Sequence, residues 1–306
     1  MKCTRCKVEA VVSLPSHNSA FCADCYLDFF TKQVEKGIHK QKLFTHDDTI
    51  LVALSGGKDS LALMLELHSL GYNVTGLHID LDIHGSSPAA RSAVERFCTR
   101  HDLPYMVKEV KEEGLSIPLV KQHIKRPVCS VCGSIKRYYF NKIAVDNNFS
   151  VLATGHNLDD EVARLFSNTL RWDKGYLADQ GPALAASDDG GFVRKVKPLW
   201  RLTEFETANY AFLKGIEIHS APCPYSKGAS FTFYKGLWEQ LEIHMPGRKI
   251  AFYQDFLRKG RPAFAHEEQA DSVLLAPCEQ CRSPTSAGLC SICRVKEIIR
   301  EKTTNA

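Results

Sequence analysis

Apolar residues in the middle of the chain follow two different periods. Short apolar runs rich in β-branched residues end at glycines or polar clusters, as buried strands do. Between them, apolar positions recur every three to four residues, which is typical of helices. The predicted strands are residues 49–54, 74–82, 104–110 and 150–155, and the predicted helices are residues 60–70, 88–100, 134–147 and 159–172. Strands that alternate with helices predict an α/β fold with a parallel sheet covered on both faces.

The same pattern predicts further elements on either side of this core. They are a helix at 24–42, a long loop at 175–191, a helix at 203–213 and a helix at 231–244. Thr203 and Glu206 have the spacing of a capping box, which favours a helix start. Pro246 and Gly247 end the last of these helices.

Size and composition set bounds on the class of protein. The chain has 306 residues, 44% of them hydrophobic and 24% charged, which is enough for one sizeable core with small appendages. A net charge of +4 permits a polyanionic partner without demanding one. The start, MKCTRCK, has no apolar signal region, and no apolar run approaches membrane-spanning length. We therefore expect a cytoplasmic protein without a membrane partner.

Cysteine is the unusual component, with twelve residues. Eight of them form four Cys-x-x-Cys pairs near the two ends: Cys3, Cys6, Cys22, Cys25, Cys278, Cys281, Cys290 and Cys293. Thiol pairs at this spacing without a secretory signal are typical of four-cysteine zinc sites. The predicted division is a zinc ribbon at 1–26, a catalytic domain at 27–270, and a second ribbon with a basic tail at 271–306.

The sequence LSGGKDS at 54–60 lies between a predicted strand and a predicted helix. It differs from the Walker pattern, because Val52 replaces the first glycine and Asp59 follows the lysine. Glycines and a helix N-terminus direct N–H groups toward an anion, and Lys58 adds positive charge. A carboxylate beside phosphate requires a cation between them, so Asp59 indicates Mg²⁺.

The fourth predicted strand ends in TGHNLDDE at 154–161, which places Asp159, Asp160 and Glu161 at a helix start. Acids favour helix N-termini anyway. However, this loop and the glycine loop both follow parallel strands, and such loops meet at one edge of the sheet. Asp59 and Asp160 are therefore predicted to share Mg²⁺. Together, SGGKDS and GHNLDDE resemble the PP-loop ATP pyrophosphatases, which cleave ATP between its α and β phosphates and transfer AMP to a carbonyl oxygen.

Four cysteines remain in the middle of the chain. Cys98 lies beside Phe97 in a helical pattern and is predicted to be a small buried hydrophobe. Cys129, Cys132 and Cys223 form an incomplete ligand set, for which three interpretations stand. They are a [4Fe–4S] cluster with one open iron, a persulfide resolved by disulfide formation, and a structural zinc with an unseen histidine.

The order of these motifs along nearly the whole chain resembles the tRNA 2-thiouridine synthetase family, which includes wobble-uridine thiolation enzymes. The resemblance implies a HUP-like PP-loop ATP pyrophosphatase domain flanked by two zinc ribbons. It implies that ATP contacts Ala53, Ser55, Gly56, Gly57, Lys58, Asp59, Ser60, Ile79, Gly155 and Asp160. It also implies catalytic roles for Lys136, Asp160 and Asp59, a [4Fe–4S] cluster on Cys129, Cys132 and Cys223, and two zinc ions on the eight terminal cysteines.

The activity implied by this resemblance is ATP-dependent thiolation of a tRNA uridine, with T-loop uridine preferred. A sulfur donor, either a ubiquitin-like thiocarboxylate protein or inorganic sulfide, and a homodimer are further expectations. The basic stretches 121–126 and 258–261 fit either phosphate contacts or solvated charge. The alternatives are wobble-uridine or cytidine thiolation by another PP-loop enzyme, an amidating ligase, and a zinc-ribbon RNA-binding protein without catalysis.

Overall fold

Strand β3 (Thr49–Leu54) shows how the sheet acquires two covered faces. Ile50, Val52 and Leu54 belong to one core cluster, and Leu51 belongs to a second cluster on the opposite face. Successive side chains of a strand point to opposite faces, so a strand buried on both faces needs an unbroken apolar run. Full burial of each such side chain contributes roughly 1.5–3 kcal/mol. The predicted α/β fold is confirmed by this arrangement.

The structure is a computed structural model, and it describes residues 1–306 except 188, 219–222, 226–229, 266–274 and 305–306. Its six-stranded sheet has the order β5-β4-β3-β6-β8-β7 and is parallel except for β7, which runs antiparallel to β8. The chain moves outward from β3 through β4 to β5 and then returns to the other side of β3 as β6. This reversal places a ligand cleft outside the carboxyl ends of β3 and β6.

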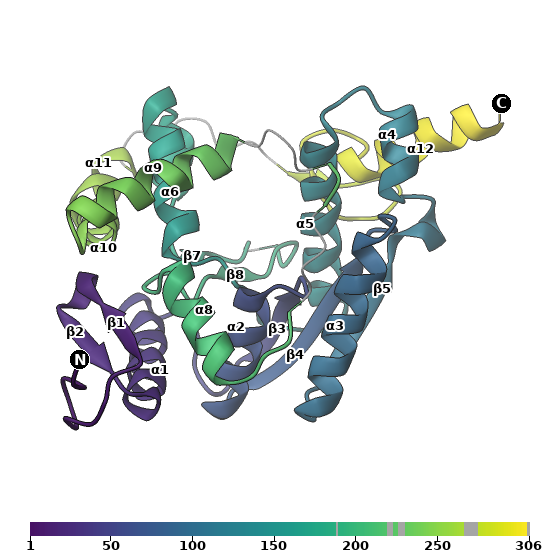
Figure 1. Ribbon diagram of the computed structural model, residues 1–306. Helices are drawn as coiled ribbons and strands as arrows, with labels where there is room; N and C mark the ends of the chain where they lie inside the picture. Colours follow the sequence, from purple (N-terminus) through teal and green to yellow (C-terminus); the bar gives the residue numbers. More distant parts are fainter. Residues whose placement is uncertain (188, 219–222, 226–229, 266–274, 305–306) are drawn as a thin grey trace.

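The elements of the sheet and its covering helices are arranged as Figure 1 shows. The other strands of the central sheet are β4 (Asn73–Asp80), β5 (Tyr105–Glu109), β6 (Val151–Thr154), β7 (Ala183–Leu184) and β8 (Arg194–Val196). The α-helices are α1 (Ala23–Gln41), α2 (Lys58–Ser69), α3 (Ser86–Arg100), α4 (Ile117–His123), α5 (Val128–Asp146), α6 (Leu158–Arg171), α7 (Lys174–Asp179), α8 (Glu204–Leu213), α9 (Ser230–His244), α10 (Arg248–Asp255), α11 (Arg261–Ala265) and α12 (Ser291–Thr304). Short helical turns are η1 (Pro15–His17), η2 (Val110–Glu113) and the π-helical η3 (Phe256–Gly260).

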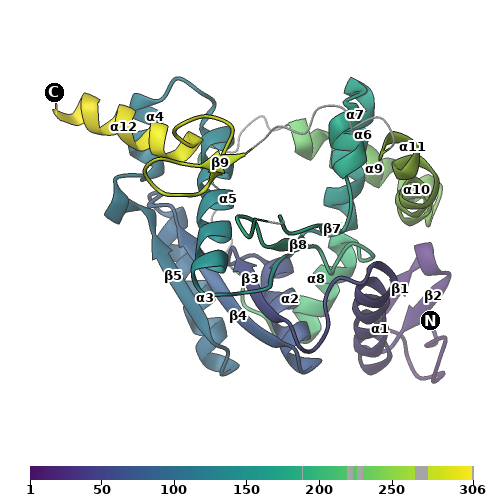
Figure 2. The same cartoon turned by 180° about the vertical axis from the view of Figure 1, so that it is seen from behind.

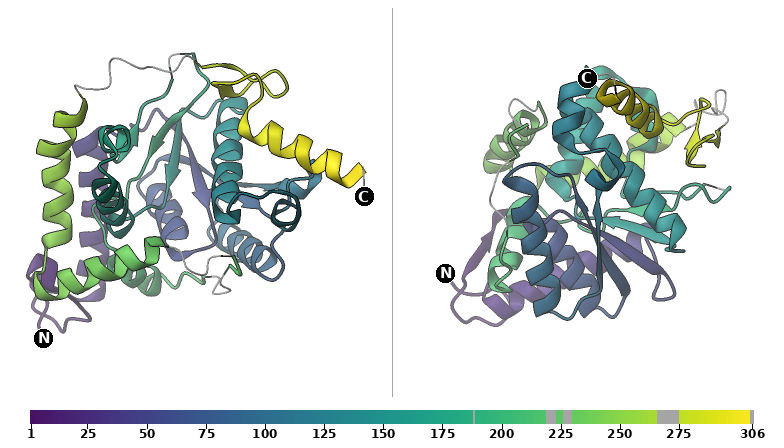
Figure 3. Two further views of the ribbon diagram at one scale, coloured as in Figure 1. Left: turned by 90° about the horizontal axis from the view of Figure 1, so that it is seen from above. Right: turned by 90° about the vertical axis from the view of Figure 1, so that its right-hand side faces the viewer.

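The two cysteine ribbons are small hairpins on opposite sides of the molecule (Figures 1 and 2). The first contains β1 (Val12–Leu14) and β2 (Ser19–Phe21), and the second contains β9 (Ala276–Pro277) and β10 (Pro284–Thr285). Figure 3 shows α9 and α10 on the side of the first ribbon and α12 on the other side, beside α5. No helix among the described residues is both long enough and apolar enough to span a membrane.

Most predicted elements are present, and the differences have local causes. The helix predicted at 134–147 begins earlier, at Val128, so Cys129 and Cys132 lie on its first two turns. The loop predicted at 175–191 was wrong, because it contains α7 and β7. These two elements are only six and two residues long, so they carry too few residues to show a period. The predicted boundary at 270/271 lies outside the described residues.

Candidate active site

The glycine loop is shaped by one close approach and one positive φ angle. Gly56 has φ +79°, and a Cβ there would lie 2.8 Å from the carbonyl oxygen of Ala90. Ser60 closes the loop, since its Oγ accepts from the N–H of Ser55 at 3.1 Å and donates to the carbonyl of Gly57 at 3.0 Å. Helix α2 begins directly afterwards at Lys58, so its N-terminal N–H groups face the cleft.

Gly155 holds the second loop against the first. A Cβ on Gly155 would lie 2.8 Å from the backbone nitrogen of Ser60 and 2.9 Å from the carbonyl carbon of Asp59. Only a residue without a side chain permits this contact between the end of β6 and the start of α2. The two motifs singled out in the sequence are therefore in direct backbone contact.

A cavity of about 490 Å³ opens at the carboxyl ends of β3, β4 and β6. The predicted ATP-contacting residues that line it are Ala53, Ser55, Asp59, Ser60, Ile79 and Gly155. Lys136 and two of the three central cysteines, Cys132 and Cys223, line the same cavity. The structure therefore brings the phosphate loop and the central thiols to one space.

Helix α5 supplies one wall of this cavity. Cys132, Lys136 and Phe140 lie four residues apart on one face and line it. Cys129 lies one turn earlier, and its thiol donates to the carbonyl of Tyr225 at 3.2 Å. Burial raises the pKa of Cys132, while the charge of Lys136 opposes that increase. Lys136 is thus close enough to limit the increase in the pKa of Cys132.

The central thiols differ from the ribbon thiols in their spacing. The four thiols of each ribbon lie within 4.8 Å of one another, whereas the described atoms of Cys129, Cys132 and Cys223 form no group that tight. Zinc–sulfur bonds of about 2.3 Å place tetrahedral ligands roughly 3.8 Å apart. The ribbons therefore have the spacing of a zinc site, and the central set does not.

The ribbon thiols cannot all ionise together without a cation. Burial opposes ionisation of Cys3, but backbone N–H groups outweigh it and lower its pKa to about 6. Hydrogen bonding to Cys22, together with burial, raises the pKa of Cys25 to about 12. A divalent cation removes this conflict because it stabilises every thiolate it binds. The donor set thus fits zinc.

Six residues form a closed ring of polar contacts beside the cavity. The Asn157 side chain donates to Asp59 at 3.2 Å, and its backbone N–H donates to Asp160 at 3.0 Å. Lys58 contacts Asp59 at 3.1 Å and Glu204 at 2.8 Å. Lys235 completes the ring, 3.1 Å from Glu204 and 2.7 Å from Asp160. We call these six residues the carboxylate–lysine ring.

Two acids of the DDE motif turn away from the cavity. Asp159 accepts from the backbone N–H of Glu204 at 2.7 Å and pairs with Lys249 at 2.5 Å. Glu161 is fully buried and pairs with Lys197 at 2.7 Å. Both therefore hold neighbouring elements in place, and only Asp160 belongs to the carboxylate–lysine ring.

His78 is a polar group of the cavity that the sequence reading did not single out. Its Nδ1 lies 2.9 Å from the carbonyl oxygen of Leu54, so Nδ1 carries the proton. Burial lowers the pKa of His78, which keeps the ring neutral. Its Nε2 has no hydrogen-bond partner among the described residues and is available as an acceptor at the cavity wall.

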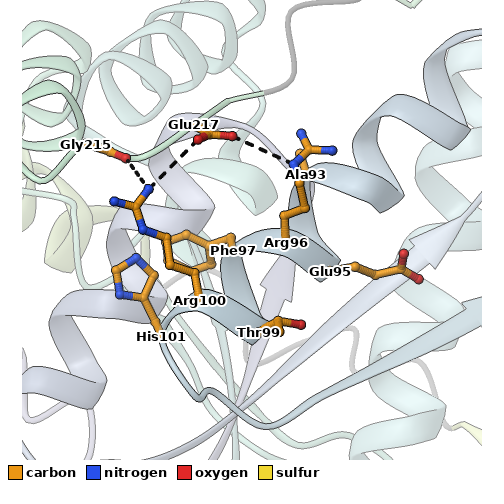
Figure 4. Close-up of a pocket in the computed structure, with 9 residues that line it drawn as sticks. All are labelled: Ala93, Glu95, Arg96, Phe97, Thr99, Arg100, His101, Gly215 and Glu217. Carbon is orange, nitrogen blue, oxygen red and sulfur yellow. Dashed lines mark hydrogen bonds and ion pairs between the residues drawn. The ribbon is translucent and has the colours of Figure 1, made fainter.

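A second cavity of about 490 Å³ lies along α3 (Figure 4). Arg96 and Arg100 face Glu217 across it at 3.8 and 3.9 Å. Both arginine side chains are 60% exposed, so these ion pairs contribute little. None of its lining residues belongs to the glycine loop or to the central cysteines.

Comparison with known proteins accounts for the arrangement. Residues 29–220 match the model of a PP-loop domain, and residues 2–27 match the N-terminal LIM domain of the 2-thiouridine synthetase TtuA. The tRNA-5-methyluridine(54) 2-sulfurtransferase of Thermus thermophilus is 39% identical over 300 residues, covering 98% of this chain and 92% of its own. The chain belongs to the PP-loop family of tRNA 2-thiouridine synthetases. The sequence resemblance is thereby confirmed.

Further relatives agree with this family. The enzyme of the same name from Pyrococcus horikoshii is 39% identical over 295 residues, covering 96% of this chain and 93% of its own. The solved structure of the U34-tRNA thiolase NcsA from Methanococcus maripaludis with its [4Fe-4S] cluster has a TM-score of 0.77 at 25% identity. That match covers 89% of this chain and 92% of NcsA.

Within this family fold, sequence reasoning found most of the cavity and missed part of its surroundings. Gly56 and Gly57 lie in the loop, while Lys58 and Asp160 lie in the carboxylate–lysine ring. Asn157 was missed although the pair Asn157 and Asp160 has capping-box spacing, which the structure confirms. Glu204 and Lys235 lie far along the chain and carry no comparable sequence signal.

Proposed function

We propose that this chain is a tRNA 2-sulfurtransferase that activates the C2 carbonyl of a uridine with ATP and then replaces its oxygen with sulfur. The observation that carries this proposal is the shared cavity, since Asp59 and Ser60 of the phosphate loop line it together with Cys132 and Cys223. A nucleobase held there is within reach of both an adenylating site and a sulfur site. Proximity of this kind replaces capture of sulfide from dilute solution.

The glycine loop binds and orients ATP. Its N–H groups and the N-terminus of α2 stabilise the negative charge that develops on departing pyrophosphate. Asp59 and Asp160 would hold Mg²⁺, because both carboxylates accept hydrogen bonds from Asn157 and oxygen ligands suit that ion. Lys136 lines the same cavity as the loop and the thiols and balances charge at the α-phosphate.

Cys129, Cys132 and Cys223 are proposed to hold a [4Fe–4S] cluster. Their thiols, unlike those of the ribbons, do not form a group within 4.8 Å among the described residues, and NcsA, the structural relative, carries such a cluster. With three protein ligands, such a cluster would leave one iron able to bind the sulfur that the donor provides. The charge of Lys136 limits the increase that burial causes in the pKa of Cys132, which must ionise to act as a ligand.

T-loop uridine is the proposed target, because the two relatives at 39% identity are named for 5-methyluridine at position 54. The wobble position is the second candidate, which the fold of the U34-tRNA thiolase NcsA favours. The donor is proposed to be a ubiquitin-like thiocarboxylate protein or inorganic sulfide. The cytoplasm as location and a homodimer as assembly complete the proposal.

Anaerobic reconstitution with iron, sulfide, ATP, Mg²⁺ and tRNA tests this function. Nucleoside mass spectrometry should show 2-thiouridine or its 5-methyl form, and nuclease mapping should place it in the T-loop. Cys223→Ala should lose product and cluster absorbance but keep its zinc, whereas Cys98→Ala should keep all three. Product at the anticodon would replace the T-loop assignment, and absence of pyrophosphate release with every tRNA would refute the proposed activity.

A further inference from the structure

Lys235 is a charged side chain directed inward from α9, a helix whose exposed residues include large apolar ones. Its side chain is 26% exposed, whereas Phe233 and Leu237 beside it on α9 are 65% and 43% exposed. A lysine normally keeps its ammonium group in water and leaves apolar side chains to the interior. An ammonium group directed inward requires a partner on the inner side of α9, and the carboxylate–lysine ring provides it.

Glu204 ties Lys235 to the phosphate loop. One oxygen of its carboxylate lies 2.8 Å from Nζ of Lys58, and the other lies 3.1 Å from Nζ of Lys235. The two ammonium groups are therefore separated by a single carboxylate. Burial raises the pKa of Glu204, but the two lysines outweigh it and lower that pKa to about 2. Glu204 consequently stays ionised and holds both lysines at neutral pH.

The charge balance of the ring does not suit a polyphosphate. It contains three carboxylates, Asp59, Asp160 and Glu204, against two ammonium groups, an excess of one negative charge. An anionic ligand entering beside this excess is repelled. Asp59 and Asp160 would be the residues that hold a divalent cation, and neutralisation of their charge would leave both ammonium groups available to other anions.

We propose that Lys235 is a second cationic ligand for the polyphosphate of ATP, acting with Lys58, and that Glu204 holds the two lysines in place until phosphate arrives. The proposal rests on the proposed function, because it requires ATP and a divalent cation at the glycine loop. It assigns α9, which follows Cys223 in the chain, to the nucleotide site. In this proposal Glu204 competes with phosphate for the two lysines, so removal of its charge strengthens phosphate binding.

Binding of α,β-methylene-ATP, pyrophosphate and AMP by calorimetry with Mg²⁺ tests the proposal without turnover. Lys235→Met should lower the affinities for pyrophosphate and the ATP analogue roughly 10- to 100-fold, the usual factor for a charge-assisted contact. The affinity for AMP should change by no more than about twofold. Lys235→Arg should retain binding within about threefold. Glu204→Gln should have the opposite effect and increase the affinity for pyrophosphate roughly three- to tenfold.

Matched charge changes separate this effect from general electrostatics. Glu239→Gln lies on the exposed side of α9, and Lys259→Met removes a lysine that is 65% exposed, so both should leave the three affinities unchanged. An unchanged pyrophosphate affinity in Lys235→Met overturns the proposal, and so does a lower pyrophosphate affinity in Glu204→Gln. A variant that weakens AMP as much as pyrophosphate also overturns it, because that pattern indicates a structural role. A wild-type chain that binds no nucleotide refutes the proposed function itself.

Discussion

Gly155→Ala offers the sharpest test of how the two loops form one site. The added Cβ would lie 2.8 Å from the Ser60 nitrogen and 2.9 Å from two further backbone atoms, where ordinary contacts begin at 3.4 Å. The end of β6 and the start of α2 must therefore separate by about 0.6 Å. Overpacking of this kind costs about 1–3 kcal/mol of unfolding free energy. A displacement approaching 1 Å lowers catalysis roughly 10- to 100-fold.

Gly57→Ala is the matched control, because it adds the same methyl group within the glycine loop itself, two residues before Asp59. Its Cβ would meet only Ser55 Oγ, at 3.4 Å, and Gly57 has φ −88°, which alanine adopts freely. We expect its unfolding free energy to change by less than about 1 kcal/mol. Anaerobic thermal melts should place Gly155→Ala several degrees below it, at roughly 2–4 °C per kcal/mol. Equal melting temperatures and equal pyrophosphate affinities for the two variants would refute the steric argument.

Three further outcomes are expected. Cys22→Ser should lower the zinc content by elemental analysis from two ions per chain to one, while Cys98→Ser, at a buried thiol outside both ribbons, should retain two. Trp200→Ala, at a fully buried side chain, should cost about 3–5 kcal/mol in thermal melts, whereas Trp172→Ala, at a side chain that is 69% exposed, should change stability by less than about 0.5 kcal/mol. The pKa of Glu204 is lowered to about 2, below its unfolded value, so its ion pairs stabilise the fold above pH 4.5 and are lost toward pH 2. Glu204→Gln should therefore melt below wild type at pH 6, and the difference should vanish as the pH falls through that range.

The sequence by itself determined the sheet core, because its strands are buried on both faces and need continuous apolar runs. It also determined the ribbons and the two loops, because the chemistry of each depends on residues close together in the chain. Cys278 and Cys281, or Gly56 and Asp59, lie within a few residues of each other, so a local motif identifies them. Elements too short to show a period, such as the two-residue strand β7, could not be predicted, because they form no local pattern.

Only the tertiary structure decided which charges meet. Asp159, Asp160 and Glu161 are equivalent in sequence, yet helical rotation of about 100° per residue directs only Asp160 into the carboxylate–lysine ring. Glu204 contacts Lys58 of the phosphate loop across 146 residues, and Lys235 contacts Asp160 across 75 residues, because α8 packs against α2 and α9 packs against α6. Contacts between elements so far apart depend on how whole helices pack, and no local pattern of residue types encodes that.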